Sequence, residues 1–276
     1  MIIYANGKYV DQKKLNFDIS DRGLLLGDGV FDTMLYQNNE LIFYSDHYKR
    51  LNNATKLLSL NFNIKKETLK KIIFNLIKKN NFQNKKIAIR TNITRGISKR
   101  GLDFEKSHKV GIYIKLNHVQ LSKFMSPIRL GLANIKRNST SPISQNKTLN
   151  YLDNVIEKNR AIKGGFEDAI FLNIDGKVSC TTTSNIFYVQ KNKIFTPPLK
   201  DGVLNGVIRG HFIKKKIATT KSTTLKNLLD SDYIFLTNSI FGIRPVESVI
   251  KCKKKYKDQK NFYTNLLRIL ESKKII

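Results

Sequence analysis

The stretch Asn146-Lys147-Thr148-Leu149-Asn150-Tyr151 joins a polar loop that closes at Ser144 to a helical pattern that opens at Tyr151. A lysine at this junction is delivered to the start of a helix, where its side chain can reach a buried cleft. Position alone is a weak indication, because the chain is rich in lysine and most lysines are solvated surface groups. Lys147 becomes a candidate catalytic residue because other segments, far apart in the chain, also have features of a ligand site.

The first of these segments runs from Asp21 to Thr33 (DRGLLLGDGVFDT), where three glycines bracket a loop that leads into a β-prone run. Glycines permit positive φ angles or a close backbone approach to a ligand, although an ordinary turn has the same composition. The remaining segments are HYKRL on a helix, the loop RGISKRGL, the stretch DGKVSCTTTSNIF, and TNS ahead of RPV, at residues 47–51, 95–102, 175–187, 237–239 and 244–246.

The composition is that of a globular protein. The chain has 276 residues, of which 41% are hydrophobic and 10% aromatic, so it can bury one large core or two smaller ones. No run approaches the roughly 20 apolar residues that span a bilayer, and the N-terminus lacks the features of a signal peptide. We therefore expect a cytoplasmic protein with no membrane partner. Cys180 and Cys252 are too few for a disulfide framework, and the four scattered histidines predict no metal site.

A formal net charge of +29 raises the question of a nucleic-acid partner, since clustered Lys and Arg neutralise phosphates. The charge is diffuse, and the densest basic runs, at residues 214–216 and 251–257, carry few aromatic residues for base stacking. We therefore expect no nucleic-acid binding. The positive field instead indicates a general attraction for small anionic substrates.

The first part of the chain alternates strand-like and helix-like patterns. Strands are expected at residues 1–4, 33–36, 87–93 and 110–116. One helix follows Ser45 and turns Leu51, Ala54, Leu57 and Leu58 inward, and a second presents apolar residues at 69, 72, 73, 76 and 77 on one face. These patterns predict a smaller N-terminal α/β domain over residues 1–117.

Polar residues from Asn117 to Ser122 and the Ser126-Pro127 pair indicate a linker at residues 118–126. Beyond it we expect strands at 130–133, 169–174, 185–190, 193–196 and 233–237, with hairpin turns at Asp175-Gly176 and Lys191-Asn192. Helices are expected from Tyr151 to Lys163, stopped by Gly164-Gly165, and from about Gly206. The sequence thus predicts an α+β protein whose larger C-terminal domain, residues 127–276, carries Lys147, with a ligand site in the cleft between the domains.

In this order and spacing the motifs closely resemble the class IV aminotransferase family, whose members are pyridoxal-phosphate enzymes of fold type IV. The resemblance covers essentially the whole chain, and its strength lies in the agreement of several separate motifs. It implies pyridoxal 5'-phosphate as the cofactor, bound in the cleft between the two domains. It also implies a homodimer, in which side chains from one subunit enter the cleft of the other.

The resemblance assigns the cofactor contacts. Lys147 matches the lysine that forms the Schiff base and then moves the substrate proton, which requires a deprotonated amine in a water-excluding site. Arg50 matches the arginine that binds the phosphate with its planar fork of donors. The backbone amides of Val207 and Ile208 match a phosphate site at a helix N-terminus, although many relatives have threonine where Ile208 stands. Further cofactor contacts are implied at Thr237, Tyr151 and Thr183.

Cys180 is the clearest departure from the family, whose members typically carry glutamate at this cofactor-binding position. That carboxylate keeps the pyridine nitrogen of the cofactor protonated, which a neutral thiol cannot do well. Asp175 is the nearest upstream acid, but it falls in a predicted hairpin turn. Two hypotheses follow. Either the ring nitrogen is unprotonated, which slows transamination more than an elimination that forms an aromatic ring, or the chain is an impaired or repurposed relative.

Residues 95–102 resemble the Arg-Gly-x-x-x-Arg-Gly stretch of aminodeoxychorismate lyases, and the stretch from Thr237 to Val246 resembles the lyase version as well. The resemblance implies that Arg100 anchors a substrate carboxylate, with Asn238 as a second substrate contact and Thr33 as a helper in proton delivery. We therefore expect a lyase that converts 4-amino-4-deoxychorismate to 4-aminobenzoate and pyruvate, a step towards folate.

Two alternatives stay open. An aminotransferase acting on D-amino or branched-chain acids gains weight from residues 137–142 (RNSTSP), which occur ahead of the lysine in relatives of uncertain activity. A protein that binds pyridoxal phosphate without turnover has Cys180 as its only support. Retention of Lys147, Arg50 and Thr237 together argues against it.

Overall fold

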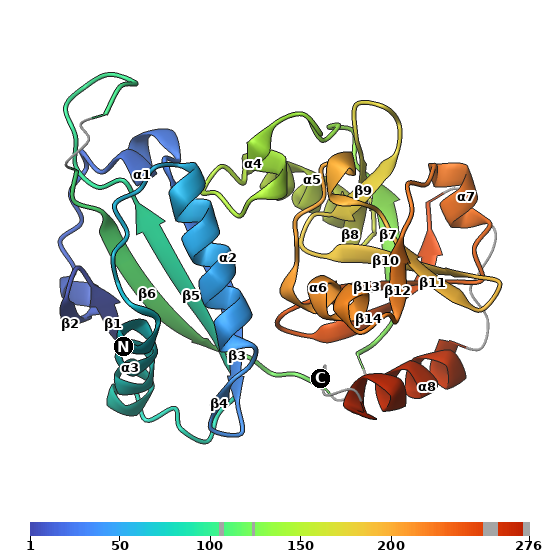
Figure 1. The fold of residues 1–276 in the computed structure, drawn as a ribbon, viewed down its shortest axis with the longest axis horizontal. Coiled ribbons are helices and arrows are strands. Elements are labelled where there is room, and N and C mark those ends of the chain that lie inside the picture. The colour runs from blue at the N-terminus through green and yellow to red at the C-terminus, as the bar shows by residue number, and fades with distance from the viewer. Residues whose placement is uncertain (105–107, 123–124, 251–258, 273–276) are drawn as a thin grey trace. The chain divides into compact units, whose positions relative to one another are not determined.

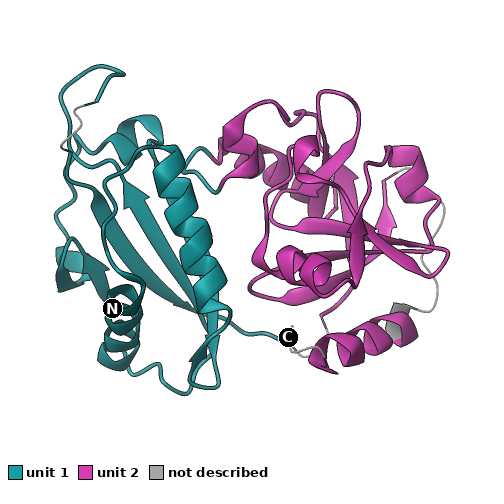
Figure 2. Cartoon of the chain, viewed as in Figure 1, with its two compact units in different colours: residues 1–121, 147–150 teal, residues 122–146, 151–276 magenta. Residues whose placement is uncertain are grey.

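The computed structural model describes residues 1–104, 108–122, 125–250 and 259–272 (Figure 1). The chain divides into two units, coloured separately in Figure 2. Unit 1 comprises Met1–Leu121 with Lys147–Asn150, and unit 2 comprises Ser122–Asn146 with Tyr151–Ile276. Lys147 thus groups with the N-terminal part of the chain, whereas the sequence analysis assigns it to the C-terminal domain. Of the predicted linker at 118–126, residues 123 and 124 lie outside the described residues.

Unit 1 is built on an antiparallel sheet with the strand order β2-β1-β6-β5-β3-β4. In β5, Ile87, Ile89 and Ile93 are buried on one face, because alternate side chains of a strand point to opposite faces. The strands predicted in this part of the chain are confirmed, and β3 begins already at Gly29. The strands are β1 (Ile2–Ala5), β2 (Lys8–Asp11), β3 (Gly29–Gln37), β4 (Glu40–Leu41), β5 (Ile87–Thr94) and β6 (Gly111–His118).

Helices α2 (Tyr44–Leu57) and α3 (Lys66–Lys79) cover one face of this sheet (Figure 1). Leu51 and Ala54 of α2 join a buried cluster with residues of α3 and of the sheet. The predicted inward position of Leu57 is wrong, because this side chain is 48% exposed. Leu51, Ala54 and Leu58 follow one helix face at spacings of three and four residues, whereas Leu57 falls on another side. The short elements are η1 (Gln12–Lys14) and α1 (Arg22–Leu26).

Unit 2 is built on a second sheet with the strand order β12-β11-β10-β13-β14-β7-β8-β9. An additional pairing of Cys180 with Asn185 joins β9 to β10 and closes the strands between them into a ring. Ile170, Ile186 and Leu236 belong to its buried core. The strands are β7 (Ile128–Leu132), β8 (Asp168–Leu172), β9 (Val178–Thr181), β10 (Asn185–Gln190), β11 (Lys193–Thr196), β12 (Ala218–Thr220), β13 (Tyr233–Asn238) and β14 (Gly242–Val249).

The hairpin turns predicted in unit 2 are confirmed. The turn between β8 and β9 contains Gly176 with φ 72°, and the turn between β10 and β11 contains Lys191 and Asn192 with φ 50° and 59°. Positive φ angles at both central residues give a turn whose twist matches the flanking strands. The helices are α4 (Pro142–Gln145), α5 (Leu152–Lys163), α6 (Val207–Lys214), α7 (Leu225–Leu229) and α8 (Gln259–Ser272), with a short 3-10 helix at Leu199–Asp201.

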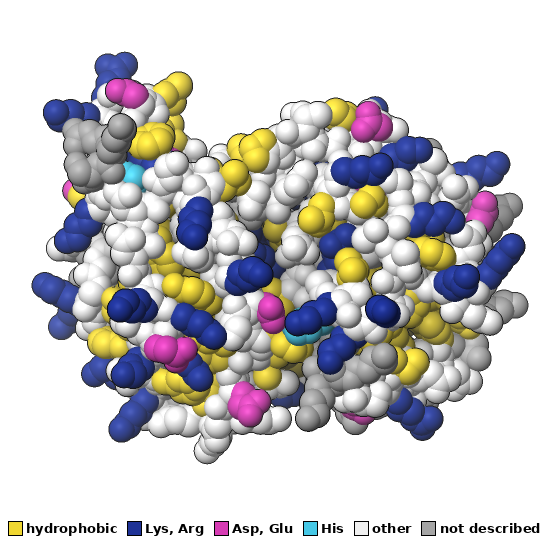
Figure 3. Space-filling model, in the orientation of Figure 1, with side chains coloured by type: hydrophobic (Ala, Val, Ile, Leu, Met, Phe, Trp, Pro, Cys, Tyr) yellow, Lys and Arg dark blue, Asp and Glu magenta, His cyan; other side chains and the backbone are white. Residues whose placement is uncertain are grey.

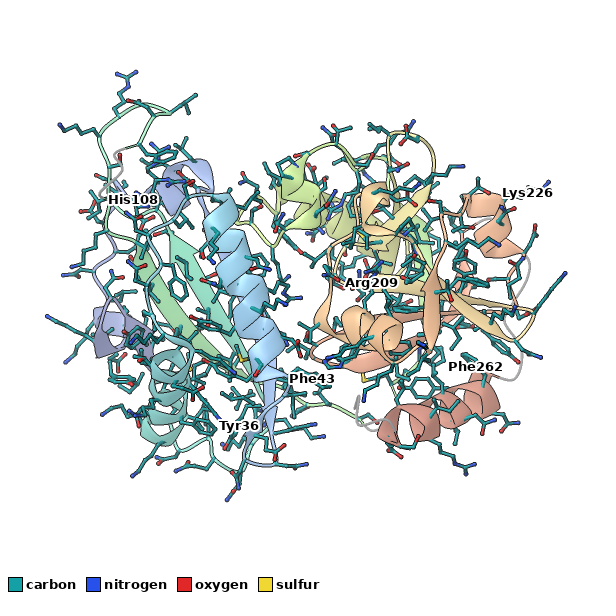
Figure 4. The ribbon with its side chains drawn as sticks, viewed as in Figure 1. Tyr36, Phe43, His108, Arg209, Lys226 and Phe262 are labelled. Carbon is teal, nitrogen blue, oxygen red and sulfur yellow. The ribbon has the colours of Figure 1, made fainter. Side chains whose placement is uncertain are left out.

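Glycines border two of these helices where the sequence predicts them. Gly164 is the C-cap residue of α5, and Gly206 is the N-cap residue of α6. Phe262 of α8 stacks on Tyr233 of β13 with the ring centroids 4.3 Å apart, which attaches the last described helix to the sheet (Figure 4). Helices and mixed strands together confirm the predicted α+β class.

Basic side chains are spread over both units on the face shown in Figure 3, with few acidic ones between them. Such a distribution agrees with a diffuse positive field. Within the described ranges, no helix has the length and apolar character needed to cross a membrane. Cys180 is buried, and Cys252 lies outside the described residues.

Candidate functional site

Lys147 is held at the start of β3 by backbone hydrogen bonds. The Phe31 N–H donates to the Lys147 carbonyl at 2.8 Å, and the Leu149 N–H donates to the Gly29 carbonyl at 2.9 Å. These bonds make residues 147–149 a short antiparallel partner of β3, which explains why Lys147 groups with unit 1. Gly29 permits the close approach, because an added Cβ would lie 2.7 Å from Leu149 Cδ1 and 2.5 Å from the Ile93 carbonyl oxygen.

The Lys147 side chain lies on the face of β3 that points away from the helices. Its Nζ is 4.1 Å from the centroid of the Phe31 ring, and the Arg90 guanidinium is 3.7 Å from the same centroid. Phe31 is on this face because its neighbour Asp32 contacts α2 on the other one. Thr33 follows Phe31 by two residues and pairs with Arg90, so its hydroxyl also lies on this face. The structure thus places the two predicted catalytic residues, Lys147 and Thr33, on one face of one strand.

Arg90 is a candidate that the sequence analysis did not single out. It lies between the buried residues Ile89 and Thr91 in β5, and its Nε donates to Asn92 Oδ1 at 2.9 Å. A basic residue between buried positions of a strand was a signal present in the sequence. Only the pairing of β5 with β3 reveals that Arg90 shares a face with Lys147.

Arg50 is held by a buried carboxylate. Asp32 accepts a hydrogen bond from Arg50 Nε at 2.7 Å and one from His47 Nδ1 at 2.6 Å. The side chains of Asp32 and His47 are 1% exposed, whereas that of Arg50 is 15% exposed. Burial alone would raise the pKa of Asp32, but the charge of Arg50, with that of His47, outweighs burial and holds this pKa well below its usual value. Asp32 and His47 were not predicted from the sequence, although His47 and Arg50 are three residues apart and share a helix face.

Arg100 lies in the loop between β5 and β6, which extends beyond the sheet next to α1 (Figure 1). Its side chain is exposed. The structure therefore places this predicted substrate-binding residue on the surface of unit 1, in a loop outside the strands of the sheet.

Unit 2 carries a helix N-terminus without a side-chain cap. Gly206 precedes α6, and the first turn of this helix contains the buried residues Val207 and Ile208. The Asn185 amide packs against Gly206, and Asn185 pairs with Thr237 across β10 and β13. Opposite residues of an antiparallel pair point to the same face, so Thr237 points to the side of the sheet where α6 begins.

Thr237 Oγ1 is buried and has no hydrogen-bond partner among the described residues. A buried polar group without a partner costs about 1–3 kcal/mol, unless a ligand supplies the missing partner. The helix dipole and the first-turn N–H groups favour an anion on the same side of the sheet. Together, the uncapped helix and the unpartnered hydroxyl fit a phosphate group.

Cys180 lies on β9, next to Asn185 of β10. Its side chain is buried, and Ser179 Oγ lies 3.7 Å from its sulfur. Thr183 is exposed, and its hydroxyl donates to Asp168 Oδ2 at 3.1 Å. Asp168 also accepts from the backbone N–H of Thr182, so this buried carboxylate stabilises the turn between β9 and β10.

Asn238 and Tyr151 have structural positions of their own. Asn238 Oδ1 accepts hydrogen bonds from the N–H groups of Ile240 and Phe241, both at 3.0 Å, and so shapes the turn between β13 and β14. Tyr151 is the half-buried N-cap residue of α5. In the part of the chain that the structure describes, His, Cys, Asp and Glu form no cluster that could hold a metal ion.

The sequence matches the family model for amino-transferase class IV over residues 29–249. It is 30% identical over 278 residues to the "Putative branched-chain-amino-acid aminotransferase" of Methanocaldococcus jannaschii, and this alignment covers 94% of this chain and 96% of that protein. It is 28% identical over 279 residues to the aminodeoxychorismate lyase of Bacillus subtilis, with 99% and 94% covered. This chain superimposes on the crystal structure of a "Putative 4-amino-4-deoxychorismate lyase" from Legionella pneumophila with a TM-score of 0.84 and 29% sequence identity. The superposition covers 95% of this chain and 97% of that chain.

Asp32→Asn tests the buried pair in unit 1. We expect the free energy of unfolding at pH 7 to fall by about 3 kcal/mol, because Arg50 loses its buried counter-charge. The folded-state pKa of Asp32 is lowered, so its stabilising contribution is fully present above the ordinary aspartate pKa and is lost only as the pH falls towards the folded-state pKa. The free energy of unfolding, measured with urea at several pH values, should therefore differ between the parent and the Asp32→Asn protein by a constant amount from pH 7 to 5. This difference should shrink only below about pH 4.

The control for this exchange is Asp46→Asn, at an exposed acid of α2, the helix that carries Arg50, which should cost less than about 1 kcal/mol. If the two proteins already had equal free energies of unfolding between pH 7 and 5, the assigned pairing of Asp32 with Arg50 would be contradicted.

Thr237→Val tests the anion site in unit 2. In protein without cofactor, we expect inorganic phosphate to raise the melting temperature, and Thr237→Val to weaken phosphate binding about 10-fold or more, because a hydrogen bond to a charged group is lost. Thr219→Val, at an exposed strand residue, is the matched control. Equal phosphate affinities of the Thr237→Val protein and the parent would exclude Thr237 from the site.

Proposed function

This chain belongs to the class IV aminotransferase family, and we propose that it is a lyase that converts 4-amino-4-deoxychorismate to 4-aminobenzoate and pyruvate. As a member of this family it is a pyridoxal-phosphate enzyme of fold type IV. The proposed reaction needs no co-reactant, because the atoms of the two products add up to those of the substrate. The loop at residues 95–102 and the relatives named as lyases support this choice of reaction.

We assign the cofactor contacts to residues of each unit, as the family resemblance implies. Its phosphate is assigned to the first-turn amides of Val207 and Ile208, the Thr237 hydroxyl and the Arg50 guanidinium. The unpartnered Thr237 Oγ1 supports the assignment of the phosphate to Thr237 and the first turn of α6. The hydrogen bond from Arg50 to Asp32 supports the assignment to Arg50, because it holds the guanidinium in place. When bound, pyridoxal phosphate supplies an aldehyde that condenses with amines and a ring that withdraws electrons. Tyr151, Cys180 and Thr183 are assigned to the cofactor from the family resemblance alone.

The observation that carries the proposal is the presence of an amine and a hydroxyl on one face of β3. Lys147 Nζ rests on the Phe31 ring, and Thr33 follows Phe31 by two residues. In the proposed reaction Lys147 removes the proton from the substrate ring carbon that bears the amine, and the bond between the neighbouring ring carbon and the ether oxygen of the pyruvate group breaks. Thr33 helps to deliver a proton to the departing pyruvate. Loss of that ring proton and of pyruvate leaves an aromatic ring.

The proposed substrate is a small anionic amino compound. Arg100 anchors one carboxylate with its planar fork of donors, and Asn238 is a second substrate contact. Arg90 adds a positive charge on the face that carries Lys147, which favours an anion there.

We also propose that the protein is a homodimer, as the family resemblance implies. Unit 1 exposes neighbouring apolar side chains in α1 and in the loop that pairs with it. Leu24 and Leu25 are 58% and 60% exposed, and Ile97 and Leu102 are 60% and 81% exposed. Exposed apolar surface of this kind marks a protein–protein contact.

The alternative within the family is an aminotransferase acting on D-amino or branched-chain acids. Its support is the identity to relatives with aminotransferase names, including a D-alanine aminotransferase of Bacillus licheniformis. A further alternative is an impaired relative that holds the cofactor without turnover, for which the uncharged Cys180 is the reason.

The decisive experiment incubates cofactor-loaded protein with 4-amino-4-deoxychorismate and quantifies 4-aminobenzoate and pyruvate. We expect equal amounts of the two products, lost in Lys147→Ala because the proton-removing amine is gone. Lys136→Ala, at an exposed lysine on the same connecting segment, is the matched control and should retain activity. No product from well-loaded protein would favour the aminotransferase, if D-alanine or a branched-chain acid then reacts, or the impaired relative, if neither does.

Cys180→Glu tests the consequence of the missing carboxylate. A carboxylate at this position would keep the ring nitrogen of the cofactor protonated and strengthen its electron withdrawal. We expect the rate of transamination, measured with D-alanine and a 2-oxo acid, to rise about 10-fold, while elimination changes less because it gains an aromatic ring. Transamination that stays at the parent rate would count against an unprotonated ring nitrogen.

A further inference from the structure

Arg22 is buried in unit 1, and its guanidinium binds the backbone of the loop between β5 and β6. Nη1 donates to the carbonyls of Gly101 at 2.8 Å and Asp103 at 3.2 Å, and Nη2 donates to that of Leu102 at 3.0 Å. Nε donates to Asp28 Oδ2 at 2.9 Å. The planar fork thus serves three successive carbonyls and one carboxylate, a pattern that a lysine cannot reproduce.

Asp28 joins Arg22 to a second arginine at the end of the sheet. Arg95 directly follows β5 and binds the two oxygens of Asp28 at 2.7 Å and 3.0 Å. Burial raises the pKa of Asp28, but hydrogen bonds from Arg95 and Arg22 outweigh burial and leave this pKa below its usual value. Arg95 also lies 3.7 Å from the centroid of the Phe104 ring and 3.4 Å from His108 Nε2, where the loop returns (Figure 4). Both arginines therefore attach the far part of the loop to the sheet.

The near end of the loop is held by the backbone at the start of α1. The Arg22 N–H donates to the Gly96 carbonyl at 2.9 Å, and Asp21 forms an isolated β-bridge with Ile97. Gly96 and Gly101 have φ angles of 85° and 129°, which glycine adopts far more easily than other residues. The residues from 97 to 100 therefore form a short segment, attached at both ends, and its last member is an exposed arginine.

We propose that Arg22 is a positioning residue for substrate binding: it holds residues 97–103 so that the guanidinium of Arg100 is pre-organised for a substrate carboxylate. This inference rests on the proposed role of Arg100. A loop without these attachments would have to be ordered at each binding event, and the entropy lost in ordering lowers the affinity. Arg22 acts on the loop through its backbone, because the guanidinium NH2 groups donate to three loop carbonyls while Nε donates to Asp28.

The same contacts explain the Arg-Gly-x-x-x-Arg-Gly pattern. The first arginine, Arg95, donates hydrogen bonds to Asp28, and the two glycines supply the turns on either side of the segment. The second arginine, Arg100, is presented to solvent. One arginine of the motif therefore shapes the loop, and the other is available for a ligand.

The test replaces Arg22 with lysine, which keeps the positive charge beside Asp28 but loses the fork. Binding of 4-amino-4-deoxychorismate is measured by calorimetry in cofactor-loaded protein with Lys147→Ala, which removes turnover. We expect Arg22→Lys to raise the Kd of this compound about 10-fold, because the loop must be ordered on binding. The affinity for pyridoxal phosphate should stay unchanged, whereas general unfolding would lower both affinities.

A second measurement does not depend on the substrate. Trypsin cleaves after Lys99 and Arg100, and mass spectrometry identifies the cleaved bonds. We expect Arg22→Lys to speed cleavage at these bonds about 10-fold, because proteolysis follows the population of the open loop. Arg129→Lys, at an arginine of unit 2 that is 50% exposed, is the matched control and should change neither binding nor cleavage.

Arg100→Ala separates this inference from the proposed function. If Arg22 acts through Arg100, then Arg22→Lys weakens binding no further in the Arg100→Ala protein. The inference would be overturned if the losses of affinity caused by Arg22→Lys and Arg100→Ala were fully additive in the double variant. It would also be overturned if the Arg22→Lys protein bound the substrate and was cleaved like the parent. Parent-like binding by Arg100→Ala would refute the role of Arg100 and with it the positioning role of Arg22. No binding by any protein, the parent included, would refute the proposed function, while the cleavage rates would still show whether Arg22 holds the loop.

Discussion

Two backbone hydrogen bonds between segments more than a hundred residues apart determine where Lys147 lies in unit 1. They join residues 147–149 to the start of β3, and they bring Lys147 onto the ring of Phe31. Because side chains alternate along a strand, the same pairing places Lys147 on the face of Thr33 and leaves Thr148 on the opposite, buried side. Gly29 is required at the contact, since any side chain there would meet Leu149 and the backbone of β5. The backbone position of the lysine thus depends on its pairing with β3.

In unit 1, two carboxylates organise the arginines around this strand. Asp32 faces α2 and fixes Arg50, and Asp28 lies at the end of the sheet and fixes Arg22 and Arg95. Both carboxyl groups have lowered pKa values because the charges and hydrogen bonds of their arginines outweigh the effect of burial. In a chain with a net charge of +29, each of these two acids compensates more than one basic group.

Unit 2 carries neutral groups of the kind that bind anions. The first turn of α6 offers N–H groups without a side-chain cap, and Thr237 offers a buried hydroxyl without a partner among the described residues. Such a site binds phosphate through dipoles and hydrogen bonds, with little dependence on pH. Cys180 adds no charge to this region, and the buried Asp168 is occupied by the turn between β9 and β10.

The sequence by itself determined many of the strands, four of the helices and two hairpin turns, because hydrophobic periodicity, helix-ending glycines and the Asp175-Gly176 and Lys191-Asn192 turns are local signals. Its motifs also identified the family, and with it the cofactor, because several separated segments occur in a fixed order. It did not determine which unit holds Lys147, that Asp32 and His47 hold Arg50, or that Arg22 holds the loop of Arg100. Those relations are hydrogen bonds between residues distant in the chain, and periodicity carries no information about distant partners. Only the tertiary structure, by pairing strands and packing helices, decided which of the many basic residues lie together.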